Sequence, residues 1–139
     1  MDIVAPYPVD EIVNAIVRTV AGVTYASPHI SPNEAELGGV VVWSAIDTSP
    51  KFSLQNLIGT THQLSFHVGA KEYGDSRDLA GRVWAALLNA PSKNWSQVVP
   101  GSRLIAVYTT DSPVETRTAG QHLNFYEHRF TVYVTVGPA

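Results

Sequence analysis

The chain has 139 residues, a formal net charge of −3 at pH 7 and no cysteine. This length fits one domain, and 45% hydrophobic residues supply a core without disulfide or metal support. Without cysteine there is no thiolate metal site, and the acidic balance disfavours non-specific binding to nucleic acid or anionic membranes. Charged residues make up only 15% of the chain, which suits a subunit whose surfaces are covered in an assembly.

Targeting and membrane segments are not expected. The N-terminal residues include Asp2 and no basic stretch, so they do not resemble a signal peptide. No apolar run approaches the ~18 residues of a membrane span.

Two segments have the apolar spacing of amphipathic helices. The first runs from about residue 8 to 21, with acidic residues near its start and Gly22 after its end. The second has Asp75 or Ser76 as a candidate N-cap and ends before Pro91.

Strand patterns occupy much of the remaining chain. Residues 23–27 are a short candidate, and 38–46 contain a continuous apolar run, typical of a strand covered on both faces or covered by a neighbouring subunit. Residues 60–69 alternate between apolar and polar side chains, and further strands are predicted at 103–110 and 121–136.

The order of these elements predicts an α+β fold, with two helices packed on one face of a largely antiparallel four- to five-stranded sheet. Residues 1–139 are expected to form a single domain. The segment 47–59 is predicted to be an extended hairpin loop with an apolar tip, and 110–120 a polar loop.

The histidines invite a test for a metal site. His62 and His67 are separated by an odd number of residues and point to opposite faces of a strand. His122 and His128 share a face but lie roughly 20 Å apart along it. Neither pair can bind one ion, while His62 with His122 or His128 across strands stays open.

Motifs for catalysis are not apparent in the sequence. There is no Gly-x-Ser-x-Gly elbow, Walker lysine or Gly-x-Gly-x-x-Gly motif. We therefore predict no catalytic, cofactor or metal residues and no enzyme activity. Trp43 and Trp84 lie on apolar patterns and are predicted to pack in the core.

Candidate contact residues lie in the segment 47–59. Four apolar side chains in a connection between strands indicate that a neighbouring subunit covers them or that the loop folds back. They are Phe52, Leu54, Leu57 and Ile58.

Two long stretches resemble the tail terminator, or tail-completion, family of long-tailed bacteriophages. They are THQLSFHVGAKEYGDSRDLAGRVWAALLNAP and SRLIAVYTTDSPVETRTAGQHLNFYEHRFTVYV. The shared pattern is an N-terminal helix and strands, a strand leading through a short Tyr/Gly turn into an Ala/Leu helix, then a strand, a polar loop and a last strand. It spans about residues 9–136, and the insertion-like stretch 47–59 departs from the shorter members.

The resemblance implies a structural virion protein whose subunits close into a ring, expected to be a hexamer, at the head-proximal end of the tail. Its implied partners are copies of itself, the tail tube protein and the head connector or stopper protein. Because a ring needs two different contact surfaces on each subunit, the resemblance also implies a second contact in the polar loop, at Asp111, Glu115 and Arg117, of which the last two would pair across subunits. It would occupy the virion, and the host cytoplasm during assembly. No membrane or sequence-specific nucleic acid partner is implied, although DNA would pass through the ring.

Two alternatives stay open. One is a head–tail connector or stopper protein of the same neck. The other is a small monomeric enzyme or ligand-binding domain that uses the polar strand face bearing histidines, and it would require convergent histidine and carboxylate groups in a pocket.

Overall fold

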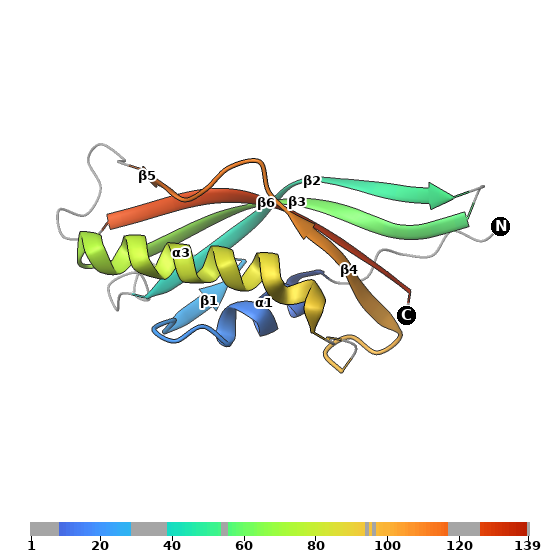
Figure 1. The fold of residues 1–139 in the computed structure, drawn as a ribbon, viewed down its shortest axis with the longest axis horizontal. Coiled ribbons are helices and arrows are strands. Elements are labelled where there is room, and N and C mark those ends of the chain that lie inside the picture. Colours follow the sequence, from blue (N-terminus) through green and yellow to red (C-terminus); the bar gives the residue numbers. More distant parts are fainter. Residues whose placement is uncertain are drawn as a thin grey trace.

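The computed structural model describes residues 9–28, 39–53, 56–93, 95, 97–116 and 126–138, without the side chains of 49–58 and 116. One sheet carries both α-helices on the same face (Figure 1), which confirms the predicted α+β class. In chain order the elements are α1 (Val9–Arg18), β1 (Tyr25–Ser27), β2 (Val40–Ser53), β3 (Asn56–Ala70), α3 (Tyr73–Asn89), the 3-10 helix η1 (Ala90–Ser92), β4 (Ser102–Tyr108), β5 (Val114–Thr116) and β6 (Tyr126–Pro138).

Helix α1 forms because its apolar residues fall on one stripe that packs into the core. Asp10 and Glu11 lie in its first turn and Arg18 in its last, so both ends complement the helix dipole. The helix ends at Arg18, before the predicted residue 21. The Thr19 hydroxyl donates to the Ile16 carbonyl 2.6 Å away, and the chain turns there.

Helix α3 begins earlier than predicted, at Tyr73, with Glu72 as its N-cap residue. The prediction of Ser76 or Asp75 as N-cap was wrong, because Ser76 lies on the buried stripe of the helix. Its hydroxyl is 3.3 Å from the Val68 carbonyl and 2.8 Å from Nδ1 of His128. Ser76 thus joins the helix to the sheet.

The sheet has six strands in the order β1-β2-β3-β6-β4, with β5 beside β6. All pairs are antiparallel except β1 with β2, so the sheet is mixed and has more strands than predicted. The additional strand, β5, lies within the segment predicted as a polar loop. Strand β6 begins at Tyr126, while residues 121–125 of the predicted last strand lie outside the described residues.

The segment 47–59, predicted as a loop, continues strands β2 and β3. The two strands pair as far as Ser53 with Asn56, with a register shift between Ala45 and Asp47 that leaves Ile46 as a bulge. Because β6 pairs with β3 only from Thr60 onward, the end of this hairpin is a two-stranded ribbon. Figure 1 shows β2 and β3 running on past both helices.

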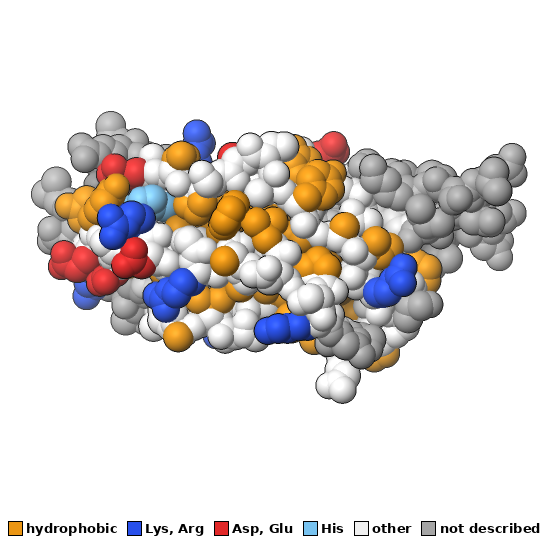
Figure 2. All heavy atoms as spheres, in the orientation of Figure 1, with side chains coloured by type: hydrophobic (Ala, Val, Ile, Leu, Met, Phe, Trp, Pro, Cys, Tyr) orange, Lys and Arg blue, Asp and Glu red, His pale blue; other side chains and the backbone are white. Residues whose placement is uncertain are grey.

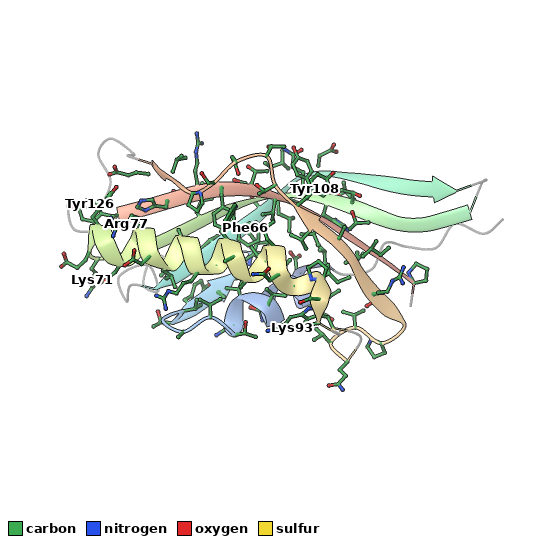
Figure 3. All side chains as sticks on the ribbon, viewed as in Figure 1. Phe66, Lys71, Arg77, Lys93, Tyr108 and Tyr126 are labelled. Atoms are coloured by element: carbon green, nitrogen blue, oxygen red, sulfur yellow. The ribbon has the colours of Figure 1, made fainter. Side chains whose placement is uncertain are left out.

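The core lies between the helices and the sheet. Trp43 and Phe66 stack with ring centroids 5.9 Å apart, and Phe66 stacks on Phe130 at 5.2 Å. Figure 3 shows Phe66 between the sheet and α3. Trp84 and Trp95 pack against this core while partly exposed, which confirms the predicted packing role of the tryptophans.

No helix in the described part of the chain combines the length and hydrophobicity needed to span a bilayer.

Candidate functional site

The predicted apolar contact residues fall on the two-stranded ribbon. Phe52 lies on β2 opposite Leu57, and Ile58 lies on β3 at a second register shift. Their side chains, and the whole of Leu54, lie outside the described structure. The backbone therefore places three of these residues together at the far end of the hairpin.

Asp111, predicted as an interface residue, closes a gap inside the sheet. Strand β4 leaves β6 at Tyr133 and β5 rejoins it at Arg129, so Thr131 between them has no strand partner on that side. Asp111 Oδ1 accepts the Thr131 backbone N–H at 3.1 Å, and the Thr109 hydroxyl donates to the Thr131 carbonyl at 2.5 Å. Two side chains thus replace the missing backbone partner.

The same connection is joined to α3. The indole N–H of Trp84 donates to the Asp111 carbonyl at 3.2 Å, although the two residues lie 27 apart in sequence. These contacts could not be predicted from the sequence, because nothing in the local pattern around Asp111 indicates a partner on β6 or α3.

We predict that Asp111→Ala lowers the free energy of unfolding by about 0.5–1.5 kcal/mol, since it removes the acceptor of the Thr131 N–H at a partly exposed position. Asp111→Asn keeps an acceptor oxygen and should cost less than half as much. Urea denaturation of both variants measures the difference. Asp47→Ala is the control: among the described residues its Oδ1 accepts from the neighbouring Thr48 N–H alone, at an exposed position, so a change above ~0.5 kcal/mol there would argue against the proposed gap closure.

Of the other two polar-loop candidates, the structure describes Glu115 but not Arg117. Glu115 lies on β5 opposite His128 of β6, whereas Arg117 lies outside the described residues. His128 is 3% exposed. Burial lowers the pKa of His128 below its ordinary value, the Glu115 carboxylate opposes this shift, and the Arg77 guanidinium adds to it.

His62 is buried near the base of the ribbon, at 6% exposure. Its Nδ1 lies 3.3 Å from the Thr48 hydroxyl, and its Nε2 has no hydrogen-bond partner among the described residues. Asp10 of α1 accepts the Trp43 indole N–H at 2.8 Å. Burial lowers the pKa of His62, and Asp10 opposes the shift by favouring the charged imidazole.

The histidines do not form a metal centre in the described structure. His67 faces away from the side that His62 shares with the core, as the odd spacing predicted. His128 lies opposite Val68, six residues along β3 from His62, or roughly 20 Å. The pairing of His62 with His128 is therefore excluded, and no group of three or more metal-ligating side chains occurs among the described residues. His122 lies outside them.

The two buried histidines predict a loss of stability in acid. In the unfolded chain both titrate near pH 6.5, whereas their folded pKa values are lower, so the unfolded state binds more protons. We therefore expect the free energy of unfolding to fall as the pH drops below ~6.5, and to stop falling below the folded-state pKa values.

Denaturant titrations at pH 7.5 and 5.5 measure this dependence. His62→Gln and His128→Gln should each remove part of the difference between the two pH values. The double variant should remove the sum, because the sites are too far apart to interact. If neither single variant changed the difference in unfolding free energy between pH 7.5 and 5.5, the buried histidines would not be its cause.

A hydrogen-bonded relay lies on the sheet face opposite the helices. His67 Nδ1 is 2.7 Å from Glu127 Oε1, and His67 Nε2 is 3.5 Å from the Ser65 hydroxyl. The order carboxylate, imidazole, hydroxyl is that of an acyl-transfer triad. However, Ser65 pairs with both β2 and β6, so its backbone N–H belongs to the sheet and is not available to stabilise an oxyanion. The hydrogen bond between His67 of β3 and Glu127 of β6 joins two adjacent strands of the sheet.

Comparison with known proteins identifies a similar fold among solved structures, but it does not assign the chain to a sequence family. No protein-family model matches the chain, and no curated protein matches it in sequence. Among solved structures it is similar to a chain from the virion of a native gene transfer agent particle. The TM-score is 0.67 at 16% sequence identity, over 90% of this chain and 91% of that one. The two chains therefore share a fold along nearly their whole lengths.

Proposed function

We propose that this chain is a structural virion protein, a tail terminator whose subunits close into a ring at the head-proximal end of a phage tail. Six subunits are the expected number. The observation that carries the proposal is the fold shared with a chain of a gene transfer agent virion over nine-tenths of both chains. It supports the role that the sequence resemblance implies, and neither observation calls for catalysis.

The geometry of the ribbon is consistent with this proposal. A two-stranded hairpin is marginally stable alone in water, so a ribbon that extends beyond β6 needs another surface to cover it. We propose that Phe52, Leu54, Leu57 and Ile58 provide one subunit contact. Glu115 and Arg117 are the proposed polar contacts, and Asp111 supports them by holding the loop in place.

The distribution of charge also agrees with a subunit that is covered on several sides. Figure 2 shows acidic side chains gathered at the end where α3 begins, with basic side chains spread singly over this face. Large areas between them are uncharged. Such areas desolvate at low cost when a neighbour covers them. The proposed partners are further copies of the chain, the tail tube protein and the head connector or stopper protein.

The test is the mass of the purified protein over a concentration series, by sedimentation or light scattering. We expect a species near six times 15.0 kDa, with a central hole in negative-stain images. If the protein stays monomeric, the same measurement is repeated with purified tail tubes, whose ends can template the ring. A protein that is monomeric and does not bind tubes would overturn the proposal, and it would favour the stopper or monomeric enzyme alternatives.

A further inference from the structure

The sheet has two outer edges that no described strand pairs. On one side, β1 covers β2 only at Val40–Val42, so the outer edge of β2 is unpaired from Trp43 to Ser53 among the described residues. On the other side, the outer edge of β4 is unpaired along the whole strand in the same part of the structure. Unpaired edges offer backbone groups to a further strand.

The registers place these two edges at the same end of the sheet. Asp47 of β2 lies opposite Gln63, Gln63 opposite Tyr133, and Tyr133 opposite Tyr108 of β4. Near the other end of β4, a corresponding row runs from Pro50 to Leu104 through β3 and β6. The unpaired stretches of β2 and β4 therefore span the same rows of the sheet.

The directions of the two strands are also complementary. Strands β2 and β3, β3 and β6, and β6 and β4 are all antiparallel, so β4 runs opposite to β2. When a second copy is placed beside the first in the same orientation, its β4 approaches β2 as an antiparallel neighbour. Such a repeat joins one surface of each copy to a different surface of the next, which is the head-to-tail type of interface that builds a ring when the rotation between copies closes.

Exposed apolar side chains mark both edges. The exposed large hydrophobic residues of the described structure are Ile46 at 57%, Tyr73 at 41%, Tyr108 at 47% and Val114 at 53%. Ile46 is the bulged residue next to Asp47, and Tyr108 ends the row that begins at Asp47. Tyr108 stacks on Tyr133 at 4.8 Å, which holds its ring in place (Figure 3).

We infer that neighbouring subunits contact each other head to tail, the β2 edge at Ile46 of one copy against the β4 edge at Tyr108 of the next. The inference rests on the proposed ring and names the surfaces that build it. The neighbours of Ile46 on β2, from Ser44 to Thr48, are exposed and include one charge, so they desolvate at low cost.

The β2 edge also limits how far such pairing extends. The bulge at Ile46 interrupts the regular ladder, and Pro50 has no N–H to donate. Edges interrupted in this way resist open-ended strand pairing. The contact is therefore a short one centred on side chains, which distinguishes a specific ring from aggregation.

Cross-linking tests the contact directly, because the chain has no cysteine and engineered thiols are unique. The variant Ile46→Cys with Tyr108→Cys is treated with a short bis-maleimide and run on denaturing gels. Head-to-tail contacts should give a series (ladder) of cross-linked bands, from dimer up to the number of subunits in the ring. Each single variant has one thiol per subunit and can form no cross-linked species larger than a dimer. The control pair is Ile46→Cys with Lys71→Cys, since Lys71 follows Ala70, which lies opposite Tyr126, seven residues or roughly 23 Å along β6 from Tyr133.

The outcomes separate this inference from the proposed ring. A ring mass with a ladder from the Tyr108 pair alone supports both. A ring mass with no ladder, or with equal ladders from the control pair, overturns the β2–β4 contact and leaves the ring standing. A monomeric mass with no ladder, in the presence of tail tubes, overturns both.

A substitution gives an independent measurement. Ile46→Asp places a charge in the contact and should raise the concentration at which half the protein is assembled by about tenfold or more. Lys71→Asp also adds negative charge, at an exposed site outside both proposed contacts, and should leave that concentration within about twofold. Equal effects of the two variants would overturn the inference.

Discussion

Replacing Phe66 by alanine should lower the free energy of unfolding by about 3–5 kcal/mol. Phe66 is fully buried, and its ring is stacked between Trp43 at 5.9 Å and Phe130 at 5.2 Å. Truncation removes the central ring of three and leaves a cavity that the flanking strands cannot close, because β2 and β6 are held by their own pairing. For a domain with about 5–15 kcal/mol of total stability, this loss is a large fraction.

The matched variant is Phe66→Leu, which keeps much of the volume and removes the aromatic stacking. It should cost less than half as much as Phe66→Ala, and urea denaturation at pH 7.5 measures both. If the two variants lost similar stability, the stacking rather than the filled volume would dominate. If neither lost more than ~1 kcal/mol, Phe66 would not be at the centre of the core.

The helices and most strands could be predicted because their signals are local. The stripe of α1 and the alternation of β3 reflect burial of one face, which depends only on residues a few positions apart. The same periodicity shows why the N-cap prediction failed. Ser76 is spaced by four residues from Ala80 on the buried stripe, so it lies inside the helix and its hydroxyl turns toward the sheet.

Other features depend on contacts distant in sequence. The parallel pairing of β1 with β2 and the closure of the gap at Thr131 by Asp111 join segments more than ten residues apart. The extension of β2 and β3 through 47–59 was missed because Pro50 and mixed polarity are typical of loops. Proline is tolerated there because the outer edge of β2 has no described strand partner beyond Val42.

The candidate contacts were only partly predictable for the same reason. Apolar residues in the segment 47–59 indicated a surface that needs cover, and that reasoning did not depend on the backbone conformation. Ile46 and Tyr108 were not selected, since each appears as one apolar residue of an ordinary strand. Only the bulge, the register rows and the exposure of their side chains in the structure distinguish them from core residues.

A second large effect is expected at Gly39, which has a positive φ of 61°. A Cβ atom there would collide with the backbone carbonyl oxygen of Gly22, which cannot move aside as a flexible side chain would. The Gly39 carbonyl also accepts the backbone N–H of Thr24 at 2.9 Å and of Tyr25 at 3.4 Å. These bonds hold the start of β1 against the start of β2, so the collision opposes the parallel pairing itself.

We expect Gly39→Ala to lower the free energy of unfolding by about 3 kcal/mol or more, of which about 1–2 kcal/mol comes from the left-handed backbone alone. Gly101→Ala separates the two parts, because Gly101 has a φ of 79° and open space around the position of a Cβ atom. Gly101→Ala should therefore lose only the ~1–2 kcal/mol that comes from the left-handed backbone conformation. Urea denaturation of both variants gives the difference, and equal losses would show that the approach of Gly22 to Gly39 does not constrain this corner.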